Sequence, residues 1–478
     1  MKKIGIALAM IILTSVSKGQ LLSDTLIASY TTTEIDSIYT AAGLPSFVGD
    51  IIYGVEVYKL IYETPDALGV TTYTSGALFI PVGDTCNGPL IGYQHGTIAN
   101  DANVPSRMGG ESVIGIIAAT GGYRVAMTDY LGLGDGPGFH PYVHAKSEAT
   151  SVIDMLRAGR QFCDSVNVPV NEQVFLMGYS QGGHATMATL REIEQYHSAE
   201  FDLVATIPMA GPYAVSGVQR EVMESDDVYS QPAYFPYIAL SYDMVYDVYD
   251  SLEQVFIPPY DSIVPEVFDR NTNIGYINGL VTPVIKDMID TTYFNAYLND
   301  SLHPFKIALR DNDLYDFVPQ SFVRIIHCSG DQVIPFGNAQ VAYDAFVAAG
   351  ADSVELFDAG ASLDHGPCAE LAIIGAKLYI DSRAKWCMVV GEGEGALKAV
   401  PQVKVTPNPF SAETELLFSN PNSSNYILTI QDLSGRVVKT VPNIRTDKIK
   451  LNWEGIDKGI YFFRLSGEQE LTGTLVAQ

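Results

Sequence analysis

A serine stands between two glycines at the point where an apolar run of this chain ends and a helix-like stretch begins. The run is Val174-Phe175-Leu176-Met177, the turn is Gly178-Tyr179-Ser180-Gln181-Gly182, and a helical pattern covers residues 184–194. A serine on a tight strand-to-helix turn has a strained backbone, and its neighbours must lack bulky Cβ substituents. Gly178 and Gly182 meet that need. The pattern predicts a nucleophile elbow at Ser180; a glycine-rich turn with a surface serine is the alternative.

The N-terminus has the pattern of a secretory signal peptide. Met1-Lys2-Lys3 precedes an apolar stretch from Ile4 to Val16, and Ser17-Lys18-Gly19 follows it. Cleavage after Gly19 would remove residues 1–19. The apolar stretch is shorter than the roughly 20 residues that span a bilayer, which argues against a membrane anchor. We therefore expect an exported chain with no integral membrane segment after cleavage.

Charge and cysteine content narrow the possible partners. The chain has 28 basic and 55 acidic residues, a formal charge of −27, which argues against nucleic acid and anionic membrane surfaces. Five cysteines in an exported chain allow two disulfides with one cysteine left over, and the sequence leaves their pairing open; they are Cys86, Cys163, Cys328, Cys368 and Cys387. No C-x-x-C pair or His-rich tract is present, so we predict no metal site.

Strand and helix signals alternate along most of the chain. Residues 54–94 are rich in strand signals, and from Tyr123 to Pro208 strand-like runs alternate with helical ones. The alternation predicts an α/β fold, a mostly parallel sheet with helices on both faces. It breaks down over residues 213–319, which are rich in Tyr, Asp and Pro and contain two amphipathic helical patterns. We interpret this segment as a cap insertion, since strand signals resume at residues 323–327 and 354–357.

A Gly/Glu-rich linker, Gly391-Glu392-Gly393-Glu394-Gly395, precedes a change in composition. After it, short alternating strands are separated by turns, and acidic and basic residues balance. This pattern is typical of a small β-sandwich. We therefore predict a body at residues 20–388 with its cap at 213–319, a linker at 389–400 and a C-terminal β-sandwich at 401–478.

A serine nucleophile needs a histidine to take its proton and a carboxylate to orient the imidazolium. On an α/β-hydrolase fold the acid and the histidine follow the serine in that order, on loops after later strands. Asp331 follows the strand that ends at residues 328–330, and His365 lies between the next strand and a helix. We predict Asp331 as the acid and His365 as the general base. Asp358 and Asp364 are rival acids, but both lie in the loop that carries the histidine.

The same chemistry needs donors for a developing oxyanion. The backbone N–H of Gln181 is one candidate, and Thr97 in Tyr93-Gln94-His95-Gly96-Thr97 is the other. A glycine-rich loop over residues 129–136 lacks the G-x-G-x-x-G and G-K-[ST] patterns of nucleotide sites. We interpret that loop as a border of the pocket and predict that no cofactor is required.

Together these motifs resemble the secretory lipase family of α/β-hydrolases, over about Gly54 to Lys385. The resemblance rests on Tyr93-Gln94-His95-Gly96-Thr97, Asp129-Tyr130-Leu131-Gly132-Leu133-Gly134, Gly178-Tyr179-Ser180-Gln181-Gly182-Gly183, Asp331 and His365. It implies a helical lid at the insertion and hydrolysis of triglycerides and other carboxylic esters.

The last module resembles the type A C-terminal sorting domain of the type IX secretion system. The similarity lies in Thr406-Pro407-Asn408-Pro409-Phe410, Asp432-Leu433-Ser434-Gly435-Arg436-Val437-Val438 and Lys458-Gly459-Ile460-Tyr461. The resemblance implies recognition by that secretion machinery and a secreted or cell-surface location. A carbohydrate-binding or adhesive β-module is the alternative.

The residues and the resemblance together predict a secreted serine hydrolase that cleaves carboxylic or lipid esters through an acyl-enzyme. Two other hypotheses stay open. One is a serine exopeptidase, because the same fold and residues cleave amides. The other is a surface binding protein on an inactive hydrolase scaffold.

Overall fold

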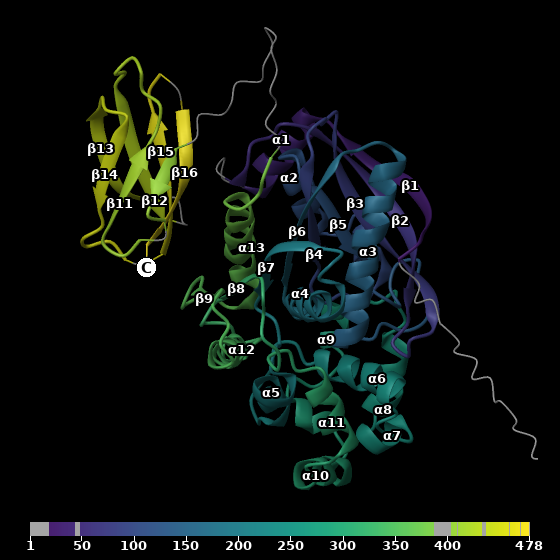
Figure 1. The fold of residues 1–478 in the computed structure, drawn as a ribbon. Helices are drawn as coiled ribbons and strands as arrows, with labels where there is room; N and C mark the ends of the chain where they lie inside the picture. The colour runs from purple at the N-terminus through teal and green to yellow at the C-terminus, as the bar shows by residue number, and fades with distance from the viewer. Residues whose placement is uncertain are drawn as a thin grey trace, which may run out of the picture.

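The computed structural model describes residues 19–43, 48–386, 403–408, 410–432, 436–457, 459–468 and 470–477. The predicted linker and all of the predicted signal peptide except Gly19 lie outside this part of the chain. The described residues form an α/β body with a helical cap, followed by an antiparallel β module (Figure 1).

A nine-stranded sheet forms the centre of the body, in the order β1-β2-β3-β5-β4-β6-β7-β8-β9. Its strands are β1 (Leu21–Tyr30), β2 (Gly54–Pro65), β3 (Thr71–Val82), β4 (Gly88–Gln94), β5 (Arg124–Thr128), β6 (Val170–Tyr179), β7 (Asp202–Met209), β8 (Phe322–His327) and β9 (Val354–Asp358). The pairs from β1 to β5 are antiparallel and those from β5 to β9 are parallel. The predicted mostly parallel sheet is therefore confirmed, and β1 is a strand that the sequence patterns did not reveal.

Helices cover both faces of this sheet (Figure 1). One face carries α1 (Thr32–Ala42), α2 (Ser112–Thr120) and α13 (His365–Asp381), and the other carries α3 (Ala145–Ser165), α4 (Gln181–Glu192) and α12 (Gly337–Ala348). The apolar run of β6 explains this arrangement. Phe175 and Met177 pack into the first layer, while Val174 and Leu176 pack into the second. A continuous apolar strand therefore requires cover on both sides.

The chain leaves the sheet after β7 and returns to it at β8 through a cap with its own hydrophobic core. Where the sequence predicted two helices, this fully described segment holds α5 (Arg220–Glu224), α6 (Tyr234–Tyr246), α7 (Leu252–Val255), α8 (Tyr260–Val267), α9 (Ile274–Asn278), α10 (Thr291–Asn299) and α11 (Pro304–Asp311). Polar side chains start several of them: Asn273 caps α9, Asp290 caps α10 and His303 caps α11. Each such residue begins a new helix, so the apolar residues of the cap lie on several short helices rather than on two long ones.

The C-terminal module consists of two antiparallel sheets. One sheet contains β10 (Lys404–Thr406), β11 (Glu413–Leu417) and β14 (Lys448–Asn452), and the other contains β12 (Tyr426–Asp432), β13 (Val437–Ile444), β15 (Gly459–Ser466) and β16 (Glu470–Ala477). Phe410, Trp453 and Leu428 lie in a core between them. Across the described ranges, no helix is both long and apolar enough to cross a membrane.

A buried ion pair lies at the end of the sheet opposite Ser180. Arg124 at the start of β5 donates to Asp84 at 2.8 Å, and both side chains are almost fully buried. Replacing Asp84 with Asn should lower the free energy of unfolding by about 3 kcal/mol, because Arg124 keeps its charge without a counter-charge. Urea denaturation measures the loss.

Asp316, whose side chain is 71 % exposed beside Arg191, supplies the matched control for this measurement. Asp316→Asn should change the stability by less than about 1 kcal/mol. Equal losses at Asp84 and Asp316 would contradict a special role for burial.

Candidate active site

Ser180 occupies the turn between β6 and α4 in a strained backbone conformation. Its φ of 61° and ψ of −122° lie outside the regions that L-residues favour. The Ser180 N–H donates to the carbonyl of Met209 at the end of β7, at 2.9 Å. The neighbouring strand therefore holds the turn in the geometry that is typical of a nucleophile elbow.

The two glycines of the turn are required by close backbone contacts. A Cβ at Gly182 would lie 1.9 Å from the carbonyl oxygen of Gln94, and one at Gly178 would lie 2.4 Å from the carbonyl oxygen of Gly182. Neither contact leaves room for a methyl group. This agrees with the reason for which the sequence pattern singled out both positions.

His365 reaches the serine from the first residue of α13. Its Nε2 lies 2.9 Å from Ser180 Oγ. The sequence placed His365 on a loop ahead of a helix, whereas the helix begins at this residue because the Asp364 side chain accepts the His365 N–H as an N-cap. The Tyr179 hydroxyl also donates to the His365 carbonyl at 2.6 Å. The N-cap and the elbow residue thus hold the backbone of His365 through its N–H and its carbonyl.

Asp331 lies just after β8 and completes a line of hydrogen bonds. One carboxylate oxygen is 2.6 Å from His365 Nδ1. The other accepts the N–H groups of Val333 and Ile334 at 2.9 and 2.8 Å. Because the carboxylate accepts the proton of Nδ1, Nε2 presents its lone pair to Ser180, as a general base requires. The structure brings the predicted serine, histidine and acid together.

A second histidine contacts the same carboxylate. His327 Nε2 lies 3.3 Å from Asp331 Oδ2 and 2.8 Å from the Ile334 carbonyl. Burial alone would raise the pKa of Asp331, but hydrogen bonds from His327 and His365 outweigh burial and lower the pKa to about 2. The sequence analysis did not find His327, and its spacing of four residues from Asp331 is the signal that could have found it.

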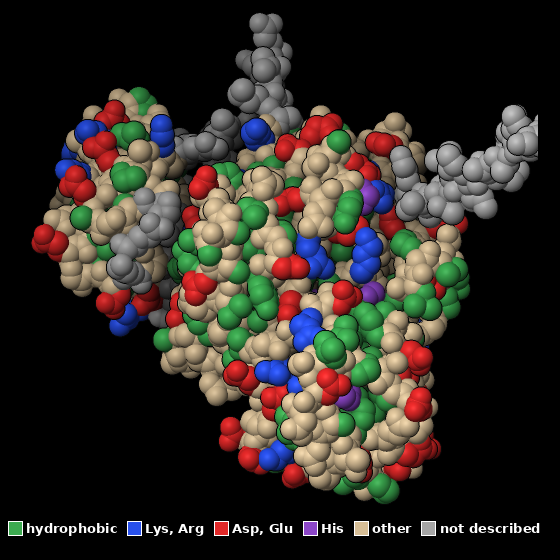
Figure 2. Space-filling view, turned by 60° about the horizontal axis from the view of Figure 1, so that its bottom comes forward, with side chains coloured by type: hydrophobic (Ala, Val, Ile, Leu, Met, Phe, Trp, Pro, Cys, Tyr) green, Lys and Arg blue, Asp and Glu red, His purple; other side chains and the backbone are tan. Residues whose placement is uncertain are grey.

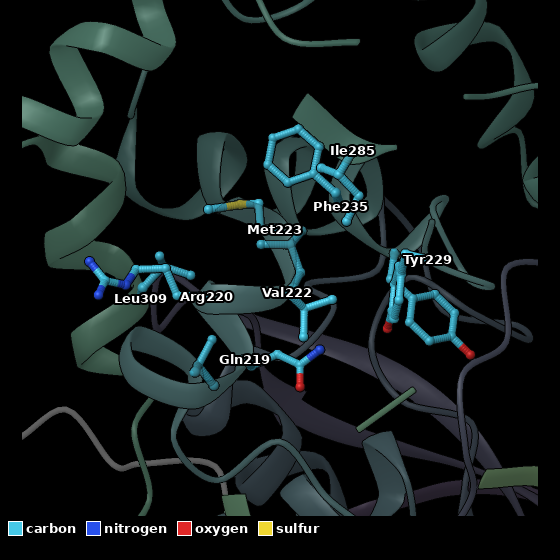
Figure 3. Close-up of a pocket in the computed structure, with 11 residues that line it drawn as sticks. Gln219, Arg220, Val222, Met223, Tyr229, Phe235, Ile285 and Leu309 are labelled. Carbon is cyan, nitrogen blue, oxygen red and sulfur yellow. The ribbon is translucent and has the colours of Figure 1, made fainter. Parts of the chain in front are cut away.

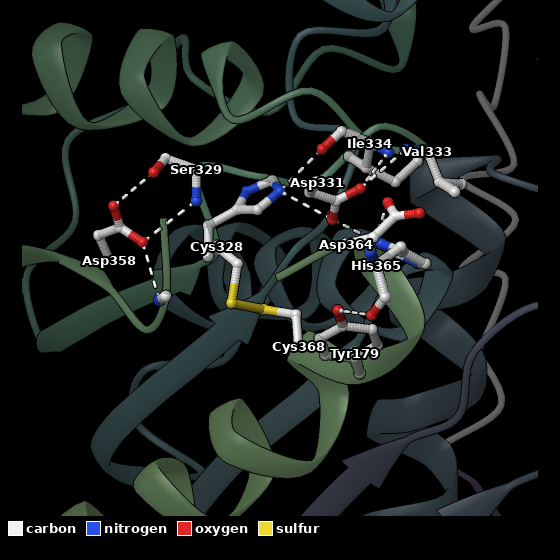
Figure 4. The surroundings of a disulfide bond; sticks show 12 residues. Tyr179, Cys328, Ser329, Asp331, Val333, Ile334, Asp358, Asp364, His365 and Cys368 are labelled. Carbon is white, nitrogen blue, oxygen red and sulfur yellow. Dashed lines mark hydrogen bonds and ion pairs between the residues drawn. A yellow bond between two sulfur atoms is a disulfide. The ribbon is translucent and has the colours of Figure 1, made fainter. Parts of the chain in front are cut away.

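A disulfide joins the acid loop to the histidine helix (Figure 4). Cys328 lies three residues before Asp331, and its partner Cys368 lies three residues after His365. Cys163 is a buried free thiol, Cys86 is disulfide-bonded as well, and Cys387 lies outside the described residues. The Cys328–Cys368 bond ties together the two segments that carry Asp331 and His365.

One predicted oxyanion donor directly follows the serine, and the other lies on a loop that approaches it. Gln181 is the first residue of α4, where backbone N–H groups have no acceptor within the helix. Thr97 follows Gly96, at which a Cβ would lie 3.8 Å from the Cβ of Ser180. Glu111 engages the Gly96 N–H at 3.0 Å, so Thr97 is the next donor along this loop.

The glycine-rich loop after β5 contacts the loop that carries Gly96 and Thr97. Asp129 is buried and accepts from Ser75 Oγ at 2.5 Å and from the Ser106 N–H at 2.9 Å. The Tyr130 hydroxyl donates to the His95 carbonyl at 3.2 Å. Among the residues that the structure describes, no three His, Cys, Asp or Glu side chains are grouped as metal ligands.

The Cys328–Cys368 bond offers a direct test of this arrangement. Its partners are 40 residues apart in the sequence, and a loop of this length predicts a loss of about 4 kcal/mol when both are replaced by Ser. We also expect slower labelling of Ser180 by a fluorophosphonate, because the acid loop and α13 lose their cross-link. Cys163→Ser is the control and should keep the labelling rate; equal rates in all three proteins would contradict this prediction.

The lowered pKa of Asp331 predicts a pH dependence of stability. A carboxyl group whose pKa falls on folding from 3.8 to about 2 stabilises the fold above 3.8, and this contribution is lost as the pH falls through that interval. Urea midpoints of the wild type should therefore fall more steeply between pH 5 and 2 than those of Asp331→Asn. Parallel curves would show that Asp331 carries no such coupling.

Comparison with known proteins agrees with this geometry. The model of the secretory lipase family matches residues 108–374, more than half of the chain, and that of the secretion system C-terminal sorting domain matches residues 404–477. A search of curated proteins found no match.

Solved structures share the fold of the body. The rice cell wall degrading esterase LipA from Xanthomonas oryzae is 29% identical with a TM-score of 0.70, covering 77% of this chain and 98% of its own. A candidate hydrolase from Legionella pneumophila is 25% identical with a TM-score of 0.71, covering 76% and 97%. Candida antarctica lipase A, at 16% identity and a TM-score of 0.57 over 76% and 83% of the two chains, shares the fold alone. The chain therefore belongs to the secretory lipase family, ester hydrolases on the α/β-hydrolase fold, and its type IX sorting domain marks it as a secreted or cell-surface protein.

Proposed function

We propose that this protein hydrolyses carboxylic esters with Ser180 as nucleophile, His365 as general base and Asp331 as the orienting acid. The observation that carries the proposal is the continuous line of hydrogen bonds from Ser180 Oγ to His365 Nε2 and from His365 Nδ1 to Asp331. Membership of the secretory lipase family supports ester bonds as the target.

In the proposed reaction, Ser180 Oγ attacks the ester carbonyl carbon while His365 Nε2 takes the hydroxyl proton. The carbonyl oxygen becomes an oxyanion, which the backbone N–H groups of Gln181 and Thr97 stabilise. His365 then gives its proton to the leaving alcohol, and an acyl-enzyme remains. Water then attacks the acyl-enzyme while His365 takes a proton from it. His365 returns this proton to Ser180 Oγ as the carboxylic acid product leaves. Asp331 stays ionised throughout and stabilises the imidazolium, in keeping with its lowered pKa.

An apolar pocket in the cap supports a hydrophobic acyl or alcohol group on the substrate (Figure 3). Val222, Met223, Phe235 and Ile285 contribute to its lining. Tyr229, also in the lining, donates to the Val333 carbonyl at 3.0 Å, and the N–H of the same peptide, that of Ile334, donates to the proposed acid. The pocket therefore lies beside the acid loop.

Another residue of the lining extends toward the oxyanion loop. The Tyr234 ring lies 6.0 Å from that of Tyr142, and the Tyr142 hydroxyl is 2.8 Å from Thr97 Oγ1. An apolar group in this pocket would thus be close both to the acid loop and to the loop that carries Thr97. Figure 2 shows acidic side chains spread over the cap rather than gathered into one patch, so this face of the molecule gives no particular support to recognition of an amino terminus.

Replacement of Ser180 with Ala tests the proposal. We expect cleavage of p-nitrophenyl esters to fall by more than about 10³-fold, because the variant has no nucleophile. Ser198→Ala, at an exposed position after α4, is the matched control and should retain the wild-type rate.

The same assay, run with short and long acyl chains and with an aminoacyl-p-nitroanilide, separates the alternatives. Cleavage of the anilide alone would indicate a peptidase. Equal background in the wild type and in Ser180→Ala would instead favour a binding protein.

A further inference from the structure

Next to Ser180 lies a buried cluster of polar side chains, none of which has a role in the mechanism above. It contains Glu148 on α3, Gln181 and His184 on α4, and His140 in the preceding loop, and all four residues are at most 2 % exposed. Such groups are costly to bury unless they are hydrogen-bonded, so their contacts constrain the surrounding structure strongly.

The side-chain amide of Gln181 has two anchors in this cluster. Its Nε2 lies 2.8 Å from His140 Nε2 and 2.9 Å from Glu148 Oε1. His140 Nδ1 faces the Leu131 carbonyl at 2.8 Å, which only accepts, so Nδ1 carries the proton. Burial lowers the pKa of His140 to about 4, and Nε2 is therefore an acceptor at neutral pH. Both amide hydrogens of Gln181 have partners, and a flipped amide would place its oxygen against two acceptors.

Glu148 is held in turn from its other side. Its Oε2 lies 2.6 Å from His184 Nδ1, and His184 Nε2 lies 3.0 Å from the Asn312 carbonyl. Each nitrogen of His184 thus faces an acceptor. The carboxylate bridges Gln181 and His184, three residues apart on α4, and ties the first turn of that helix to α3.

We propose that Glu148 is a positioning residue that fixes Gln181 and thereby aims its backbone N–H at the oxyanion. This role rests on the proposed function. Gln181 directly follows Ser180, whose φ is 61°, and it begins a helix whose first N–H groups have no intrahelical acceptors. The carbonyl of the peptide between the two residues accepts the N–H groups of Gly183 and His184 at 2.8 and 3.2 Å, and the side-chain anchors of Gln181 add a second hold on the residue that carries the N–H. An oxyanion donor is effective only when it is held at hydrogen-bond distance from the developing charge.

The test combines Glu148→Met, Gln181→Ala and the double variant, assayed on a short-chain p-nitrophenyl ester. Glu148→Met keeps an unbranched side chain of similar length but removes both acceptor oxygens, and Gln181→Ala keeps the backbone donor while it removes the anchor. A whole oxyanion donor is worth about 10²–10³-fold in kcat, so misplacing one should lower kcat by about 10-fold in each variant, with little change in KM. Affinity for a trifluoromethyl ketone, which forms an oxyanion on Ser180, should fall by a similar factor.

The double variant distinguishes positioning from a purely structural role. If Glu148 acts through Gln181, the double variant should be no slower than the slower single variant. Asp84→Asn, at the opposite end of the sheet, is the control for lost stability and should leave kcat unchanged.

Wild-type kcat in Glu148→Met, or multiplied losses in the double variant, would overturn the positioning role. If Glu148→Met does not fold, Gln181→Ala with wild-type kcat and ketone affinity would overturn it equally. Loss of activity in Ser180→Ala beside an unaffected Glu148→Met would reject only this inference. Full activity in Ser180→Ala would reject the proposed function itself.

Discussion

The contact between Gly182 and the carbonyl of Gln94 determines the geometry around Ser180. A Cβ at Gly182 would lie 1.9 Å from that oxygen, and one at Gly178 would lie 2.7 Å from it. The first turn of α4 is therefore pressed against the last residue of β4. The same strand continues into the loop that carries Gly96 and Thr97. One close backbone approach thus positions both the serine turn and the loop that we propose stabilises the oxyanion.

The order of the parallel strands determines what reaches the serine. Because β6, β7, β8 and β9 are neighbours in that order, the segments that follow them emerge at one edge of the sheet. The acid loop follows β8 and the histidine helix follows β9. The Cys328–Cys368 bond and the hydrogen bond between Tyr179 and His365 then fix the distances that strand order alone would leave free.

Local patterns were sufficient for the parts of this structure that depend on neighbouring residues. The run from Val174 to Met177 predicted a buried strand, and the glycines around Ser180 predicted the turn. The first strand was missed because Leu21–Tyr30 lies at the edge of the described sheet, paired with β2, and is largely exposed. Such a strand lacks the apolar run that reveals a buried one.

The buried cluster next to Ser180 could not be found in this way. Glu148 and His184 are 36 residues apart and meet only because α3 and α4 pack on the same face of the sheet. In the sequence each is a polar residue on a helix, where exposure to solvent is the usual expectation. The cysteine pairing was open for the same reason, since chain separation does not specify which segments the fold brings together.

The cap contributes the pocket while the body contributes the proposed chemistry, and a few polar contacts join the two. Arg270 binds Asp101 at 3.0 Å and donates to the Gly134 carbonyl at 2.8 Å, and the Tyr237 hydroxyl donates to the Ile98 carbonyl at 3.0 Å. Most of the pocket lining comes from α5, α6 and the segments between them, whereas Ser180, Asp331 and His365 adjoin sheet strands. Val333 and Ile334, whose N–H groups bind Asp331, belong to the hydrophobic core of the cap, whereas Tyr179, beside Ser180, belongs to the core of the body. Substitutions in the cap core can therefore reach the proposed acid through the acid loop while they leave the turn at Ser180 in place.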